Sequence, residues 1–296
     1  MSNNEILAED PVTIHIIAGP TASGKSALAL KIAHEHNGVI INCDSMQMYD
    51  ALHVLAAQPT KDDMAVVPHK LYSVLQPEEH TSAGIWRDMA ESEIEHAIAE
   101  DRTPIICGGN GMYIKSLMEG LSPIPQIPKD VREAAVKRQE ELGNPGFYNE
   151  LMERDPESAA RFHPQHTARL IRAWEVLAAT GRTLSEWQKK TKNAPPDHWN
   201  FEVHKVMPER EELYRRCDER FAKMLDEGAL EEVRKLSAEI DNGDVPPDAL
   251  ITKAHGYEPL RDYLHGKISK EKAIELAQIE TRQYAKRQVT WFKNQL

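Results

Sequence analysis

Cysteine is scarce in this sequence, and its three occurrences form no recognisable pattern. Cys43, Cys107 and Cys217 are odd in number and lie far apart among the 296 residues. They match neither a disulfide framework nor a cysteine-based zinc signature, so a reducing cytoplasm is the expected compartment. Cys43 and Cys107 each end an apolar run, where a buried free thiol is common.

The sequence also lacks long hydrophobic runs and the pattern of a secretory leader. No apolar run approaches the ~18–20 residues that a membrane span needs, and residues 1–10 are polar and acidic. Hydrophobic residues make up 41% and charged residues 28%, which is ordinary for a soluble protein with a sizeable core. We therefore expect no membrane partner, one large domain or two unequal ones, and a monomer.

Positive charge is in deficit, with 36 Lys and Arg against 47 Asp and Glu and a net charge of −11. This argues mildly against a nucleic-acid partner, because phosphate binding needs a basic surface. The distribution is uneven, however: acids gather in residues 90–101, whereas the last sixteen residues contain four basic residues and no acid. The bulk charge does not decide the partner.

Strand and helix patterns alternate in the first 120 residues. Short β-branched apolar runs at 13–19, 38–44 and 103–109 predict buried strands, and helical spacing at 25–36 and 112–120 predicts helices. This alternation predicts an α/β fold with a parallel sheet built from βαβ units.

Two proline-rich stretches, 121–130 and 193–199, interrupt this pattern. Helical periodicity without a convincing strand lies between them. We therefore predict a helical insertion domain at 121–199 within a catalytic core formed by 1–120 and 200–296.

After the insertion, the sequence predicts one strand and two helices. Strand character returns at 201–207, and 210–236 predicts one long helix with a glycine inside. The chain closes with a predicted helix at 269–294, with Ser269 as its N-cap.

Residues 19–26, GPTASGKS, fit G-x-x-x-x-G-K-[ST] between a predicted strand and a predicted helix, the context that a phosphate-binding loop requires. Backbone N–H groups and the helix dipole favour an anion, Lys25 adds a positive charge, and Ser26 is placed to bind Mg²⁺. The residues expected to bind a di- or triphosphate are Gly19, Pro20, Thr21, Ala22, Ser23, Gly24, Lys25 and Ser26. ATPases, small-molecule kinases and transferases that release diphosphate all use such a loop.

Asp44 ends the second predicted strand, at the edge of the sheet that carries the phosphate loop. Ligands of open α/β sheets bind at this edge. Three roles fit Asp44 at this point: a ligand of Mg²⁺, a general base, or a structural cap on the turn that begins at Ser45.

Six blocks, in order and over nearly the whole chain, resemble the signatures of the tRNA dimethylallyltransferase family, also called tRNA isopentenyltransferases. The blocks are GPTASGKS (19–26), DSMQMY (44–49), SAGIWRD (82–88), GGNGMYIKSL (108–117), RLIRAWEVLAATGRTLSEWQ (169–188) and TRQYAKRQVTWFKN (281–294). The resemblance implies a P-loop NTPase-like core and transfer of a dimethylallyl group from its diphosphate, with Mg²⁺, to N6 of the adenosine just 3′ of the anticodon. It also implies that the helical insertion holds the anticodon stem-loop of tRNA.

The resemblance assigns roles to individual residues. Asp44 matches the family's general base, Arg220 its pyrophosphate-binding arginine, and Asn110 stands where the family has a threonine near the reacting phosphate. Residues that match positions contacting the adenosine or the tRNA are Asp44, Ser45, Met46, Gln47, Arg132, Ala168, Arg169, Leu170, Ile171 and Arg172. Arg282 and Lys286, on the basic last helix, are added as tRNA contacts because of the charge asymmetry. Solvated surface remains the alternative for Arg132, Arg220, Arg282 and Lys286.

The chain departs from the family pattern at three positions. Asn110 replaces threonine in GGNG, Gln58 replaces a basic residue, and Ala168 stands where glutamine is common. Asn110 fits a helix N-cap, and its amide can also donate to a diphosphate oxygen; Gly108 and Gly109 are expected to let the backbone approach the ligand. Two other functions stay open: a P-loop kinase of a small metabolite, and a tRNA-binding homologue with weakened catalysis.

Overall fold

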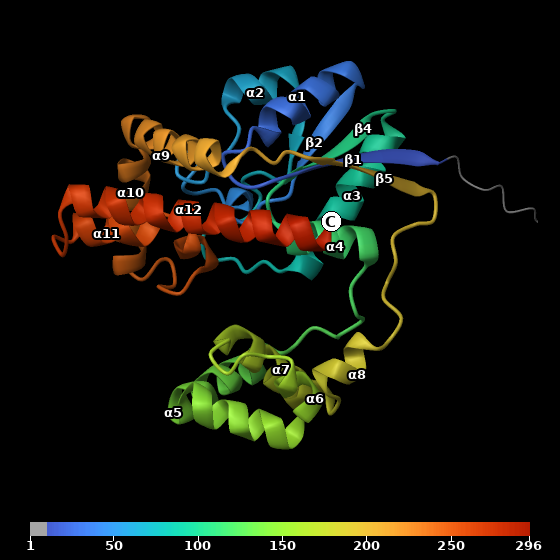
Figure 1. The fold of residues 1–296 in the computed structure, drawn as a ribbon, viewed down its shortest axis with the longest axis vertical. Helices are drawn as coiled ribbons and strands as arrows, with labels where there is room; N and C mark the ends of the chain where they lie inside the picture. Colours follow the sequence, from blue (N-terminus) through green and yellow to red (C-terminus); the bar gives the residue numbers. More distant parts are fainter. Residues whose placement is uncertain (1–10) are drawn as a thin grey trace, which may run out of the picture. The chain divides into compact units, whose positions relative to one another are not determined.

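The computed structural model describes residues 11–296 (Figure 1). The prediction that the chain begins without a secretory leader rests on residues 1–10, outside the described part. The chain divides into two compact units, Met1–Met118 with Pro196–Leu296 and Glu119–Pro195. We call the first the core unit and the second the helical unit.

The core unit contains one parallel sheet of five strands in the order β3-β2-β4-β1-β5. The strands are β1 (Val12–Ala18), β2 (Gly38–Asn42), β3 (His69–Lys70), β4 (Thr103–Gly108) and β5 (Trp199–Lys205). The predicted α/β class with a parallel sheet is confirmed. β5 follows the helical unit in sequence but pairs with β1 along its whole length, from Val12 with Trp199 to Ala18 with Lys205.

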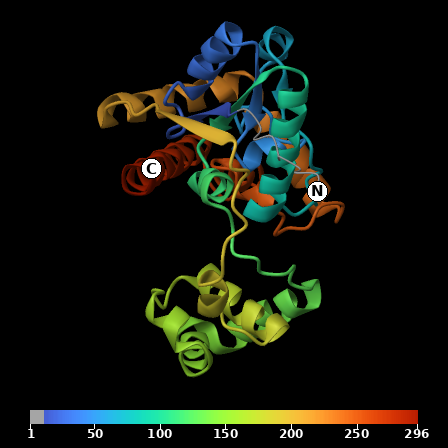
Figure 2. The same ribbon diagram turned by 90° about the vertical axis from the view of Figure 1, so that its right-hand side faces the viewer.

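Helices cover both faces of the sheet, which explains why its strands are continuous apolar runs. On one face, α1 (Lys25–Glu35) packs Ala29 and Ile32 against Ile17 and Ile105. On the other face, the apolar cluster of α3 (Ala83–Ala99) and α4 (Gly111–Glu119) joins the opposite sides of the same strands. Figures 1 and 2 show α1 in blue and the last helix in red on opposite sides of the sheet. The short elements η1 (Met46–Met48) and α2 (Lys61–Val66) follow β2.

The C-terminal part of the core unit is helical, and its four helices pack against one another (Figure 1). They are α9 (Arg210–Asp226), α10 (Ala229–Asp241), α11 (Tyr257–Leu264) and α12 (Lys270–Gln295), with the short η2 (Leu250–Lys253) before α11. The prediction of one helix over 210–236 is wrong, because α9 ends at Asp226 and Gly228 takes a left-handed conformation with φ 105°. The N-cap prediction for Ser269 is confirmed by its side chain, which accepts a hydrogen bond from Lys272 N at 3.2 Å.

The helical unit consists of α5 (Lys129–Arg154), α6 (Pro156–Ala160), α7 (Thr167–Thr180) and α8 (Leu184–Gln188). α5 is kinked where Gly143 has φ 61° and Pro145 follows it. The unit has its own apolar core, built mainly from α5 and α7 around Phe147, Leu151 and Leu170.

Cys43, Cys107 and Cys217 are buried free thiols, which the apolar runs predicted for the first two only. Between residues 11 and 296, no helix is both long and apolar enough to cross a membrane.

Candidate active site

The phosphate loop joins β1 to α1 at the carboxyl end of the sheet. Gly24, with φ 98°, lets the chain turn into the helix without a side-chain cap. Lys25 reaches back across the loop, and its Nζ donates to Pro20 O at 2.7 Å. Burial lowers the pKa of Lys25, because its positive charge is removed from water without a full ion pair. The loop thus holds a partly buried cation where an anionic ligand would bind.

Gln288 on α12 ties this loop to the turn after β4. Its Oε1 accepts a hydrogen bond from Thr21 N at 2.8 Å, and its Nε2 donates to Gly109 O at 2.8 Å. The side chain is buried, so both bonds lie in the protein interior. Sequence analysis did not identify Gln288, although it lies within the TRQYAKRQ block.

The glycines of the GGNG turn are required by protein contacts. A Cβ on Gly108 would lie 2.0 Å from Cys43 O, one on Gly109 2.2 Å from Gln288 Nε2, and one on Gly111 2.3 Å from the Trp291 ring. Protein contacts alone thus require these glycines, and the approach of a ligand to Gly108 and Gly109 stays a prediction. These glycines let β4 and α4 approach β2 and α12.

Asn110 caps α4. Its Oδ1 accepts a hydrogen bond from Tyr113 N at 3.3 Å, and its own carbonyl accepts the first helical bond, from Ile114 N at 3.1 Å. Asn110 is not among the residues that line the pocket described below. The cap is shown by these bonds, and a contact between its amide and a diphosphate stays a prediction.

Asp44 lies just beyond β2, fixed by hydrogen bonds on both sides. Its backbone N–H donates to Asn42 Oδ1 at 2.8 Å, and its Oδ1 accepts from Met46 N at 3.0 Å. The cap on the following turn is therefore real, and it also orients the carboxylate. Burial raises the pKa of Asp44, while the Met46 N–H and the charges of Lys25 and Arg220 oppose that rise. A carboxylate with a raised pKa is a stronger base than one in water.

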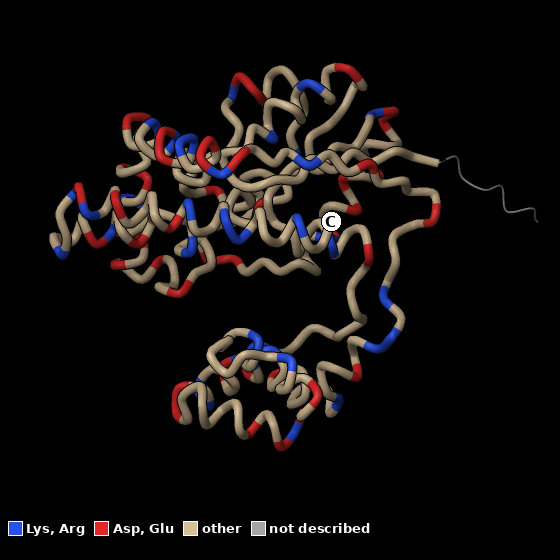
Figure 3. The backbone as a smooth tube through the Cα atoms, in the orientation of Figure 1, with Lys and Arg blue, Asp and Glu red and all other residues tan. Residues whose placement is uncertain are grey.

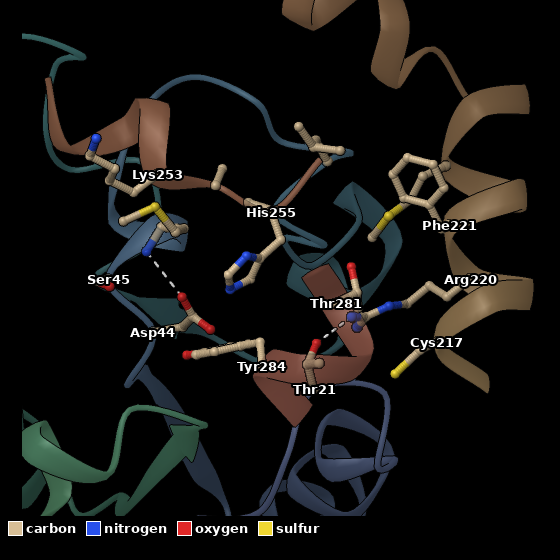
Figure 4. A pocket seen from close by; sticks show the side chains of 15 residues that line it. Thr21, Asp44, Ser45, Cys217, Arg220, Phe221, Lys253, His255, Thr281 and Tyr284 are labelled. Carbon is tan, nitrogen blue, oxygen red and sulfur yellow. Dashed lines mark hydrogen bonds between the residues drawn. The ribbon is translucent and has the colours of Figure 1, made fainter. Parts of the chain in front are cut away.

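A pocket of about 230 Å³ opens between η1, α9 and α12 (Figure 4). Arg220 and Thr21 meet on one side of it, where Arg220 Nη2 donates to Thr21 Oγ1. Asp44 lies on the other side, with His255 between them in the view. Burial lowers the pKa of Arg220, so a second partly buried cation lines the pocket, near enough to Lys25 of the phosphate loop for the two charges to interact.

The pocket carries an aromatic pair that sequence analysis missed. The ring centroids of His255 and Tyr284 lie 4.5 Å apart. Burial, with a smaller effect of Arg287, lowers the pKa of His255 to about 4, so the imidazole is neutral at pH 7. Burial raises the pKa of Tyr284. Both rings are therefore uncharged surfaces suited to stacking.

The segment after Asp44 lines the pocket through Ser45 and Met46. Gln47 donates both of its amide hydrogens to backbone carbonyls, those of Ala56 at 2.9 Å and Ala57 at 2.8 Å. Only its Oε1 is left to accept a hydrogen bond from a ligand.

Gln58, which replaces a basic residue of the family pattern, has a structural role. Its Nε2 donates to Tyr49 O at 2.8 Å, and its Oε1 accepts from Ser73 Oγ at 2.8 Å. The amide thus ties its loop to the segments after η1 and after β3.

The tRNA contacts predicted in the helical unit divide into two groups. Arg132 and Arg172 both bind the buried Glu175, at 3.2 Å and 2.7 Å. Ala168 and Arg169 are exposed, whereas Leu170 and Ile171 lie in the apolar core of the unit. The side chains of Leu170 and Ile171 are therefore not available to tRNA, and contact through the backbone of this segment stays a prediction.

The basic residues of α12 also differ in their surroundings. Arg282 Nη1 forms an ion pair with Asp218 at 2.5 Å, whereas Lys286 is exposed. Figure 3 shows Lys and Arg positions along the whole of α12, and the sequence has no acid in this helix after Glu280.

The amino-acid sequence of this chain is similar to those of known proteins along nearly its whole length. The family described as IPP transferase matches residues 47–295. Two proteins named tRNA dimethylallyltransferase, from Rhodospirillum centenum and Paramagnetospirillum magneticum, are 46% and 48% identical to this chain over 281 residues, covering 95% of this chain and 88% of each relative.

Solved structures show the same likeness. A tRNA isopentenylpyrophosphate transferase from Staphylococcus epidermidis matches 97% of this chain and 91% of its own, with 34% identity and a TM-score of 0.66. A eukaryotic dimethylallyltransferase described as acting on tRNA matches 95% of this chain and 70% of its own, with 27% identity and a TM-score of 0.81. These structures share the P-loop NTPase-like sheet described above, so the chain belongs to the IPP transferase family, the family of the tRNA dimethylallyltransferases.

Proposed function

We propose that this protein transfers a dimethylallyl group from dimethylallyl diphosphate to N6 of the adenosine 3′-adjacent to the anticodon in tRNA, releasing diphosphate. The observation that carries this proposal is one pocket with a carboxylate, Asp44, on one side and Arg220 with the phosphate-loop Thr21 on the other. Named relatives with this activity at 46–48% identity support it. A small-metabolite kinase has no comparable support.

The cationic side of the pocket suits the leaving group. In the reaction the C1–O bond of the allyl diphosphate breaks, and the electron pair leaves with the diphosphate oxygen. Lys25 and Arg220 sit beside that position, held by Pro20 O and Thr21 Oγ1. Fixed cations at a site of growing negative charge lower the barrier without having to reorganise. The N-terminus of α1 adds its backbone N–H groups.

The carboxylate side suits the nucleophile. An adenine amine is weakly nucleophilic, because its lone pair is delocalised into the ring. As N6 bonds to C1 of the allyl group, one N6 proton must leave, and Asp44 is the buried base available to take it. Gln47 follows the pocket-lining Met46 without lining the pocket itself, so any contact it makes with the adenine would be through its Oε1, since its amide hydrogens are already bonded.

Mg²⁺ is the metal that we propose for the diphosphate. Ser26 offers an exposed hydroxyl at the start of α1, and the diphosphate offers its own oxygens. Such oxygen donors fit Mg²⁺. When bound, the ion would neutralise part of the diphosphate charge.

The pocket walls and the exposed basic residues supply the remaining recognition. His255 and Tyr284 present uncharged rings to the pocket, and an adenine taken out of the anticodon stack would find a stacking surface there. Arg169, Arg132 and Arg172 of the helical unit, with Lys286 on α12, are the basic residues that we propose for the tRNA backbone.

Incubation of the protein with Mg²⁺, labelled dimethylallyl diphosphate and a tRNA transcript tests this function. We expect N6-prenylated adenosine and diphosphate in equal amounts, and no product from a transcript carrying guanosine at the acceptor position. A phosphorylated small molecule formed from ATP would instead show a kinase. Salt-sensitive tRNA binding without turnover would show a homologue that has lost catalysis.

A further inference from the structure

A second cluster of chemically reactive side chains lies on the core unit, away from the pocket. It consists of His15 in the middle of β1 and of Glu202 and His204 on the edge strand β5. His15 pairs in register with Glu202, and Ile17 with His204. Since alternate residues of a strand face the same side, the three side chains lie on the face that α1 covers through Ile17.

The donor atoms of these side chains have the spacing of metal ligands. His15 Nδ1 lies 3.0 Å from His204 Nε2 and 3.5 Å from Glu202 Oε2, and His204 Nε2 lies 3.3 Å from Glu202 Oε1. Ligand atoms ~2.1 Å from a tetrahedral ion stand about 3.4 Å apart. The observed separations lie near that value, with Glu202 facing His15 through Oε2 and His204 through Oε1. One ligand atom from each of the three side chains lies within 4.8 Å of the other two, so small side-chain rotations would let one ion contact all three.

Hydrogen bonding alone leaves this arrangement incomplete. The two facing nitrogens are joined by one proton, which one histidine donates and the other accepts. With that proton used, neither facing nitrogen can also donate to the Glu202 carboxylate beside them. A divalent cation would satisfy both nitrogens and the carboxylate together.

We propose that His15, Glu202 and His204 bind a divalent transition-metal ion, zinc foremost. Two imidazoles and one carboxylate are a common zinc donor set that leaves the fourth position to water. Mg²⁺ does not fit, because it prefers oxygen ligands. The site is separate from the phosphate loop, since His15 precedes Gly19 by four residues, or about 13 Å along a strand.

The position of the site indicates a structural role. β5 is the edge strand, and its side chains Glu202 and His204 are partly exposed. Just beyond His204, Val206 N donates to Ala18 O at 2.8 Å, and Val206 O lies so close to Gly19 that a Cβ there would be 2.4 Å from it. A metal that joins β5 to β1 would therefore stiffen the strand against which the phosphate loop begins.

Cobalt binding tests this site without relying on catalysis. The chelator-treated full chain is titrated with Co²⁺, and the absorption of tetrahedral cobalt is followed, then displaced with Zn²⁺. We expect one ion per chain, and a loss of affinity in His204→Gln that exceeds the ~10–100-fold typical of losing an outer-shell partner. His163→Gln is the matched control, because His163 also lies beside a second histidine, His166, but outside the cluster.

Thermal unfolding provides a second measurement. Zn²⁺ at about 100 times its Kd should raise the Tm of the wild-type chain by roughly 5–10 °C, and should not raise that of Glu202→Gln or His204→Gln. Glu202 is half exposed, so we expect Glu202→Gln to fold. It can therefore be measured even if His204→Gln does not fold. Absence of 1:1 binding, or equal binding by wild type and both variants, would overturn the site. Neither result depends on whether the chain transfers a dimethylallyl group.

Discussion

Basic side chains form ion pairs in the helical unit, whereas two partly buried basic side chains of the core unit are bound only to neutral oxygens. In the helical unit Arg132 and Arg172 share the buried carboxylate of Glu175. In the core unit Lys25 and Arg220 are bound only to neutral oxygens, those of Pro20 and Thr21. Neither forms an ion pair with the described residues, and burial lowers both pKa values.

From this difference we infer that the arginines paired with Glu175 are structural, whereas Lys25 and Arg220 are available to a ligand. A buried charge without an ion pair costs free energy, and the nearby Asp44 opposes only part of that cost for Lys25 and Arg220. An anionic ligand such as a diphosphate would oppose the rest. The paired arginines of the helical unit instead stabilise its α5–α7 contact and contribute positive charge only from their exposed sides.

Removal of one unpaired cation tests this difference with the largest expected effect. Lys25→Met should lower kcat/KM for prenyl transfer by at least ~10³-fold, because a fixed charge beside the leaving group is lost. The Tm should stay equal or rise, since the methionine keeps the apolar stem without the buried charge. Steady-state kinetics and thermal unfolding measure the two quantities. A large fall in Tm would mean that Lys25 is a structural residue.

Asp44→Asn should lower kcat by about 10²–10³-fold while tRNA binding is retained, because asparagine keeps the oxygen that accepts from Met46 N. In the wild-type chain, kcat/KM should fall as the pH drops through the raised pKa of Asp44. A full rate for the asparagine variant would remove Asp44 as the base.

The same raised pKa gives a stability prediction of known sign. The folded state binds the Asp44 proton more tightly than the unfolded state does, so stability is lost as the pH rises through the folded pKa. Asp44→Asn should therefore be at least as stable as wild type at pH 7, with the difference closing at low pH. Denaturant unfolding at several pH values measures this.

Glu175→Ala should act on the helical unit alone. Removal of the buried carboxylate should cost about 3 kcal/mol, the low end for a broken buried pair, because Arg132 and Arg172 still reach water. Hydrogen exchange should speed up in α5–α8 and not in the sheet. The matched control is Glu157→Gln, whose exposed pair with Lys189 should be worth at most ~1 kcal/mol. Equal effects of both changes would show that Glu175 has no special role.

The sequence identified those parts of the site that lie on local motifs. Lys25 and Asp44 follow strands that their apolar runs predict, and Arg220 was matched individually to the family's pyrophosphate-binding arginine, outside the six blocks. His255, Tyr284 and Gln288 were missed because they reach the site only through the tertiary packing of α12 and of the short segment between η2 and α11. Leu170 and Ile171 were assigned to tRNA from the resemblance, although the i, i+3, i+4 spacing of Leu170, Ala173 and Trp174 already indicates a buried face.

Asn110→Thr makes the smallest change, from one hydrogen-bonding cap to another. Asn110 Oδ1 already accepts from Tyr113 N, and the residue does not line the pocket, so we expect kcat to change less than about twofold, or ~0.4 kcal/mol. Threonine is a slightly weaker N-cap than asparagine, so stability should fall by only a few tenths of a kcal/mol, against ~1 kcal/mol for Asn110→Ala. A change of kcat at equal stability would show instead that the amide Nδ2 contacts the diphosphate. The Asn110→Ala control separates the two cases, because a pure cap changes the free energy of unfolding and leaves the rate of prenyl transfer by the folded protein intact.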